Sequence, residues 1–154
     1  MTLHPARAIA SILLIGSSLL ISVMVLGVVV AKLLVDAGTV VDPSDALLLG
    51  DLIGVLPFII AFAVAGLVAA VGLLVGTRWS DDLAFGTAIV AIAVGAIGLI
   101  LLTVGRDPAA SAEAARSTTE TIAVIGAFVA LYLSIIVAVA VARLPRPIST
   151  GAMA

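Results

Sequence analysis

Residues 52–77 read LIGVLPFIIAFAVAGLVAAVGLLVGT, and they contain no charged side chain. About 20 apolar residues are enough for a helix to cross the hydrocarbon core of a bilayer, and this stretch holds 26 residues. Three further uncharged stretches, each of at least 22 residues, lie at 8–31, 83–105 and 121–142. The four stretches predict four membrane-spanning helices.

The composition indicates that lipid, not water, surrounds most of the chain. Of its 154 residues, 64% are hydrophobic and 10% are charged, and the mean hydropathy is +1.42. A soluble domain is usually about half apolar and about a quarter charged, and a chain of this length has too little interior to hide so much apolar surface. We therefore expect one integral membrane domain over residues 1–154 in the cell membrane, or in the membrane of an enveloped or membrane-containing virion.

The predicted fold class is all-α, a four-helix transmembrane bundle that runs up-down-up-down through spans at about 8–31, 50–77, 83–105 and 121–142. The first stretch is longer than the 7–15 apolar residues of a signal peptide, so we expect it to be retained. Beyond the last span, the prolines of the segment LPRPIST end the helix. Residues 143–154 are therefore expected to form a flexible tail.

The basic residues favour a cytoplasmic location for both termini. With four spans, the side of the membrane that holds the termini carries Arg7, Arg78, Arg143 and Arg146, and the opposite side carries Lys32, Arg106 and Arg116. The positive-inside rule places the richer side in the cytoplasm. Trp79, next to Arg78, fits an aromatic anchor at the inner membrane surface.

Most acidic residues are explained by loops and helix starts. In residues 42–45 Asp42 can cap a helix whose first position is Pro43, and Asp45 falls in its first turn. Ser80-Asp81-Asp82 can begin the third helix in the same way, and Ser117-Thr118-Thr119-Glu120 has capping-box spacing before the fourth. Asp36 is expected in the loop that contains Gly38.

Asp51 and Pro57 stand apart from these loop residues. A helix that runs from Pro43 to Thr77 would be about 50 Å long at about 1.5 Å per residue, so it must protrude, tilt or break. Pro57 removes one helical hydrogen bond and can kink the helix, and a kink beside a carboxylate is one way in which membrane proteins build ion sites. The alternatives are a kink that serves packing alone and an ion pair of Asp51 with Lys32.

Small residues recur four apart along three of the spans, as in helices that approach closely in a membrane. The pairs and runs are Gly50 and Gly54, Ala61, Ala65 and Ala69, Gly72 and Gly76, Ala91 and Gly95 with Gly98 nearby, Ala123 and Ala127, Gly126 and Ala130, and Ala138 and Ala142. We expect small-xxx-small packing within the chain first, and contact between copies of the chain second.

Hydroxyl groups lie inside the first and fourth spans. Ser11, Ser18 and Ser22 share one face of the first span, and Tyr132 lies near the middle of the fourth. A phenol in hydrocarbon needs a hydrogen-bond partner, and a serine of the first span can supply it. These groups are expected to hold the helices together, and the alternative is a polar lining for a permeation path.

The sequence offers no reactive constellation, so we expect no catalytic, cofactor or metal residues. It has no cysteine, and its single histidine is His4 near the terminus. No acidic residue falls in the centre of a span, where proton or sodium carriers commonly need one. The basic patches are too small for nucleic acid.

The expected function is that of a non-catalytic integral membrane subunit or assembly partner of a larger membrane protein complex. Its partners would be the lipid bilayer and either other membrane subunits or copies of the chain itself. The alternative is a small oligomeric channel or transporter. The candidate polar or packing positions are Asp51, Pro57, Lys32, Tyr132, Ser18 and Ser22.

Overall fold

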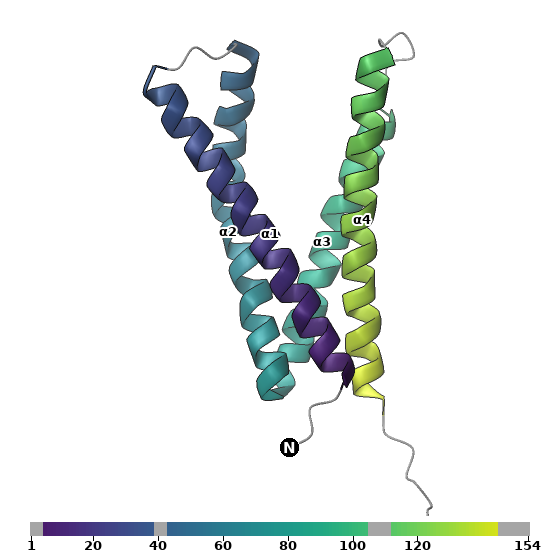
Figure 1. Ribbon diagram of the computed structural model, residues 1–154. Coiled ribbons are helices and arrows are strands. Elements are labelled where there is room, and N and C mark those ends of the chain that lie inside the picture. The colour runs from purple at the N-terminus through teal and green to yellow at the C-terminus, as the bar shows by residue number, and fades with distance from the viewer. Residues whose placement is uncertain (1–4, 39–42, 105–111, 145–154) are drawn as a thin grey trace, which may run out of the picture.

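The protein is all-helical in the computed structural model, which describes residues 5–38, 43–104 and 112–144, with side chains for all of these except 43–51 and 112–115. Four α-helices make up the described chain: α1 (Pro5–Asp36), α2 (Pro43–Val75), α3 (Arg78–Val104) and α4 (Ala112–Arg143) (Figure 1). Each contains an apolar stretch long enough to cross a membrane, namely Pro5–Asp36, Leu52–Val75, Arg78–Val104 and Arg116–Arg143. The fold class predicted from the sequence is confirmed at this level.

The helices extend beyond the predicted spans, and three predicted boundaries are wrong. Asp36 is the last residue of α1 and not a loop residue, α3 begins at Arg78, and α4 includes 117–120. The helices continue past the apolar stretches because polar residues also form helix in water, and ion pairs four residues apart support α1 and α4 there. α2 begins at Pro43 as predicted, whereas Asp42 and residues 145–154 of the predicted tail lie outside the described residues.

A two-residue turn joins α2 to α3. Gly76 follows the last residue of α2 with φ of +82°, a backbone conformation that glycine adopts without a steric penalty. The backbone nitrogens of Gly76 and Thr77 both donate to the carbonyl of Gly72, at 2.9 and 3.1 Å, which satisfies a helix-end carbonyl. The turn therefore brings α3 back beside α2 directly.

The four helices form a V of two hairpins, α1–α2 and α3–α4 (Figure 1). α1 begins, α2 ends, α3 begins and α4 ends at the narrow end of the V, which we call the closed end. The hairpins separate toward the opposite, open end. Besides the contacts within each hairpin, α1 packs on α4 and α2 packs on α3.

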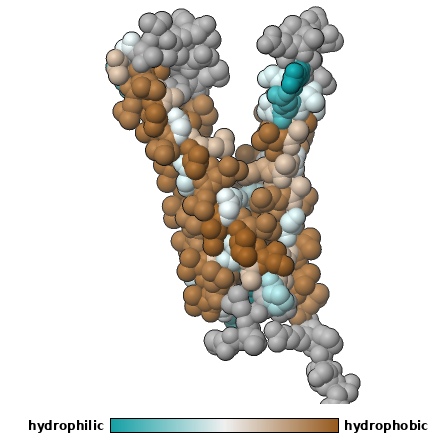
Figure 2. All heavy atoms as spheres, in the orientation of Figure 1, coloured by the Kyte–Doolittle hydropathy of each residue, from teal (hydrophilic) through white to brown (hydrophobic). Residues whose placement is uncertain are grey.

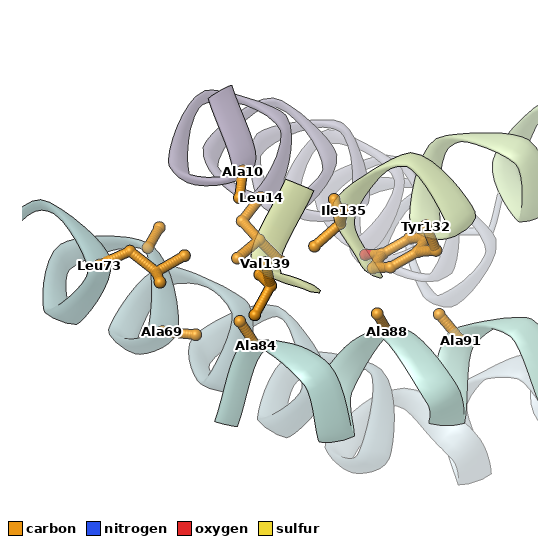
Figure 3. Close-up of a cluster of buried hydrophobic side chains, with 11 residues drawn as sticks. Ala10, Leu14, Ala69, Leu73, Ala84, Ala88, Ala91, Tyr132, Ile135 and Val139 are labelled. Atoms are coloured by element: carbon orange, nitrogen blue, oxygen red, sulfur yellow. The ribbon is translucent and has the colours of Figure 1, made fainter. Parts of the chain in front are cut away.

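The hydrophobic core occupies only the closed half of the V. Its fully buried members come from all four helices and include Leu14, Leu73, Tyr132, Ile135 and Val139 with a set of alanines (Figure 3). Among the described side chains, none is buried beyond Ile21 in α1, before Ala63 in α2, beyond Gly95 in α3 or before Tyr132 in α4. Figure 3 shows Leu14 and Val139 near Ala84 of α3, whereas Ala88 and Ala91 lie farther along α3 toward Tyr132.

The first helices of the two hairpins bury corresponding positions. The buried positions of α1 are Ala10, Ser11, Leu14, Ser17, Ser18 and Ile21, and those of α3 between 80 and 91 are Ser80, Asp81, Ala84, Thr87, Ala88 and Ala91. Each member of the second set follows its counterpart by 70 positions, and Tyr132 of α4 corresponds in the same way to Phe62 of α2. α1 and α3 thus present matching positions to the core, although none of the paired residues is identical.

Apolar side chains cover the outside of the V and both walls of its opening. Figure 2 shows a mostly hydrophobic surface on the closed half and on both arms, with a wide cleft between the arms. Exposed residues of the arms include Met24, Leu33, Phe58, Leu101 and Val124. In water this surface would be unfavourable, whereas in lipid it is ordinary.

Candidate functional site

The floor of the cleft is a layer of aromatic and hydroxyl side chains. The Tyr132 hydroxyl donates to Ser17 Oγ over 3.1 Å, and both residues are buried. Ser17 in turn donates to the carbonyl of Leu14 at 3.0 Å. The hydrogen bond expected between Tyr132 and a serine of α1 is therefore present, but its partner is Ser17, which lies beside the expected Ser18.

Two phenylalanines complete this layer across the junction of the hairpins. The ring centre of Phe128 lies 4.7 Å from that of Tyr132, and the ring of Phe62 lies 5.9 Å away, both in tilted orientations. Tilted pairs at such separations are favourable. Since Phe62 belongs to α2 and Tyr132 to α4, the rings join the two hairpins where they separate, and they close the bottom of the cleft.

Ser18 and Ser22, predicted as candidate positions, serve the packing of α1. Ser22 is exposed and its hydroxyl donates to the Ser18 carbonyl at 2.8 Å. The buried Ser18 lies so close to α2 that a Cβ on Gly66 would stand 2.6 Å from its Oγ. Ser11 also reaches α2, where it donates to the Ala70 carbonyl at 2.9 Å. Glycine and serine together thus set the close approach of α1 to α2.

At the closed end two ion pairs hold the start of α3: one links the two hairpins, and the other lies within the α3–α4 hairpin. Arg7 of α1 contacts Asp81 of α3 at 2.6 Å, with side chains 23% and 9% exposed. Arg143 of α4 contacts Asp82 at 2.5 Å and lies over the ring of Phe85, 5.8 Å from its centre. The acids of the first turn of α3, predicted only to begin that helix, therefore connect it to α1 and α4.

The Arg7–Asp81 pair is incompletely satisfied by the described residues. One nitrogen of Arg7, Nε, and one carboxylate oxygen of Asp81, Oδ1, are buried without a hydrogen-bond partner among them. Sequence reasoning missed both ion pairs, although it had placed these arginines and acids at one end of the bundle. Opposite charges at the same end of adjacent helices are the signal that could have predicted them.

Lys32, one of the candidate polar positions, pairs with Asp36 one turn along α1. The pair forms because the extension of α1 to Asp36 places the two side chains four residues apart, where they meet. Asp51 lies in α2, but its side chain is outside the described residues, as is that of Asp45.

α2 continues through Pro57, which is exposed. Proline lacks the N–H that would donate one turn back, to Ile53, but the helix does not end there. The nearest described aromatic of the core, Phe62, follows five residues later. Pro57 therefore lies in the open half of the V, outside the packed core.

Some of the predicted small residues are buried: Ala69, Gly72, Ala91 and Gly95. A Cβ on Gly95 would stand 2.5 Å from Val129 Cγ2 of α4. On α4, Ala123, Ala127 and Ala130 are exposed together with Ser134 and form a stripe on the surface, whereas Gly126, Ala138 and Ala142 are half-buried.

A shallow apolar groove of about 370 Å³ runs along the outside of the last turns of α2. It is lined by Leu67, Val68, Val71, Gly72, Val75, Thr77 and Trp79. Trp79 is 52% exposed, and its ring would stand 3.2 Å from a Cβ on Gly72. The predicted interfacial tryptophan therefore forms one wall of this groove at the closed end.

Among the described residues there is no group of three or more His, Asp or Glu that could hold a metal ion. The described polar side chains of the cleft floor make hydrogen bonds, and those of the closed end form ion pairs. No protein-family model, curated protein or solved structure matches the chain.

Proposed function

We propose that the protein is a non-catalytic integral membrane subunit, whose open half receives a transmembrane helix of another subunit of a larger membrane complex or of a second copy of the chain. The observation that carries this proposal is the confinement of the core to the closed half of the V. Membrane helices associate through close packing and polar contacts. Across the cleft, the described residues of the two arms make neither close packing nor polar contacts with each other.

In this proposal the chain runs up-down-up-down across a cell or virion membrane, with the closed end and both termini on the cytoplasmic side. The positions of Arg7, Arg78 and Arg143 at the closed end support this orientation through the positive-inside rule. The cleft then opens toward the outer leaflet, so a partner helix would enter it from that side of the membrane.

The shape of the cleft floor supports a helix as its occupant. Tyr132, Phe128 and Phe62 form a rigid platform between the hairpins, and the walls above it are apolar (Figure 2). Such walls complement a hydrophobic helix and offer no described group for chemistry on a substrate. The exposed small-residue stripe of α4 supports a second contact, because small side chains allow helices to approach closely.

A photoreactive side chain on α1 tests the proposal. Met24 follows Ser17 by seven residues, so it lies on the same face of α1, above the cleft floor, and it is 65% exposed. A photoreactive residue at Met24 is expected to form an adduct with one protein partner in the source membrane. Leu26 is equally exposed, at 62%, but nine residues from Ser17 puts it on the opposite face, so it serves as the control. Lipid adducts alone at both positions would contradict the proposal.

A second candidate function is a small oligomeric channel or transporter. The specific observation in its favour is the cleft, which is open at one end of the V and ends at the packed core of the closed half (Figure 2). Ion or solute flux through liposomes that contain the purified chain, altered by Tyr132→Phe, would favour this candidate. Absence of flux would count against this candidate, and the subunit proposal would then stand by itself.

A further inference from the structure

The groove beside Trp79 has the dimensions of a lipid site. Its wall on α2 runs from Leu67 to Val75, which is about 12 Å along the axis at about 1.5 Å per residue. A single leaflet of the hydrocarbon core is about 15 Å deep, half of about 30 Å. The groove therefore reaches from the end of the span into most of one leaflet, as a phospholipid acyl chain does.

The groove is apolar along its whole length, and its two ends lie at different depths. Leu67 and Val68 lie at its deep end, and Thr77 and Trp79 lie at the end of α2, where the chain turns into α3. Tryptophan favours the headgroup level of a bilayer because its ring is apolar while its N–H can form hydrogen bonds. A lipid that placed its acyl chain against α2 would thus bring its headgroup to the residues next to Trp79.

Arg78 does not line the groove, but it lies in the chain between Thr77 and Trp79, which do. Its side chain is exposed, and both described acids of the closed end contact other arginines: Asp81 contacts Arg7 and Asp82 contacts Arg143. Arg78 therefore carries a positive charge that no described acid of the chain balances. A guanidinium group binds phosphate through paired hydrogen bonds, and anionic headgroups add to this attraction.

We infer that the groove and Arg78 together bind one anionic phospholipid, with an acyl chain along α2 between Leu67 and Val75 and the headgroup phosphate at Arg78. This inference goes beyond the proposed function. It requires that the four helices span a membrane, but not that the cleft holds a partner. Failure of the lipid site would leave the cleft proposal unaffected.

Trp79 is the only tryptophan in the sequence, so its fluorescence reports on the groove directly. The full chain is reconstituted in phosphatidylcholine vesicles that contain a small fraction of lipid brominated on the acyl chains. The brominated lipid is either phosphatidylglycerol, which is anionic, or phosphatidylcholine. Bromine quenches tryptophan on contact, so the two titrations give the relative affinity of the groove for the two headgroups.

We expect phosphatidylglycerol to bind about five-fold more strongly than phosphatidylcholine, the effect of one arginine near an anionic surface. Arg78→Gln should abolish this preference while phosphatidylcholine quenching stays unchanged. Arg116→Gln, an exposed arginine of α4 at the open end, should keep it. Val71→Phe, which fills the groove and retains Arg78, should reduce quenching by both lipids.

Equal quenching by the two lipids, or a preference that persists in Arg78→Gln, would overturn the inference and make the groove an ordinary lipid contact. Protection of Trp79 from both brominated lipids would also overturn it, because another protein surface, such as a second copy of the chain, would then cover the groove.

Discussion

Arg7 and Asp81 are 74 residues apart in the sequence, yet their side chains meet at 2.6 Å and hold α1 against the start of α3. The Asp81 side chain is only 9% exposed. A carboxylate in this position depends on its counter-ion, because a charge that is removed from water and left unpaired is strongly unfavourable. The pair is therefore a main connection between the two hairpins at the closed end.

Replacing Arg7 by Gln is expected to destabilise the bundle by about 2 kcal/mol. This value is less than the roughly 3–5 kcal/mol typical of breaking a fully buried pair, because Arg7 retains some contact with solvent. The free energy of unfolding, measured by titration with a denaturing detergent in mixed micelles, checks the value. Arg116→Gln is the control, since its pair with Glu120 is exposed and contributes less than about 0.5 kcal/mol. Equal effects of the two substitutions would contradict the role given to Arg7.

Tyr132→Phe removes the hydrogen bond to Ser17 while it keeps the aromatic layer. We expect a loss of about 0.6 kcal/mol, the average for a hydrogen bond between membrane helices. Ser17→Ala should cost a similar amount, and the double variant should cost little more than either alone, because both remove the same bond. Ser134→Ala is the control on α4, since this hydroxyl is exposed and bonds within its own helix. Fully additive effects would contradict a direct interaction.

Gly95→Ala is expected to weaken the contact of α3 with α4. The new Cβ would stand 2.5 Å from Val129 Cγ2, and because the valine side chain is stiff, the helices must shift at a cost of about 1–3 kcal/mol. Gly95→Ala combined with Val129→Ala should recover most of the loss. In the same helix Gly86→Ala meets nothing within 4 Å and should not destabilise. Equal free energies of unfolding for Gly86→Ala and Gly95→Ala would contradict the close packing of α3 on α4 at Gly95.

The orientation of the bundle can be tested with single cysteines, since the natural sequence has none. Ala37 at the open end and Leu144 at the closed end are both exposed. A membrane-impermeant thiol reagent applied to intact cells should label Ala37→Cys, whereas Leu144→Cys should react only after the membrane is permeabilised. Labelling of Leu144→Cys alone in intact cells would reverse the proposed orientation.

The number and type of helices could be predicted because hydrocarbon excludes charged side chains, so long uncharged stretches mark the spans. The helix ends could not be located in this way. Hydropathy indicates where lipid ends, but the helices continue into water, as α1 does to Asp36 and α4 does from Ala112. A polar segment can form helix as readily as loop when oppositely charged residues in it lie four apart, as Lys32 and Asp36 do, and as Arg116 and Glu120 do.

The shape of the bundle also could not be predicted from the sequence. How closely two helices approach depends on which residues meet between them. Gly66 lies opposite Ser18, and Gly95 lies opposite Val129. Spacing along one helix indicated small residues in α4 as well, but Ala123, Ala127 and Ala130 are exposed. Hydrogen bonding of Tyr132 to α1 was predictable from the need of a buried phenol for a partner. The choice of Ser17 depends on the relative rotation of two helices.

The central claim is that the open half of the V is completed by another membrane chain. Native mass spectrometry after mild-detergent extraction from the source membrane tests it most directly. The account predicts that the chain is recovered with another membrane protein, or with copies of itself, at a fixed stoichiometry. Recovery as a stable monomer, with only lipid bound, would contradict it.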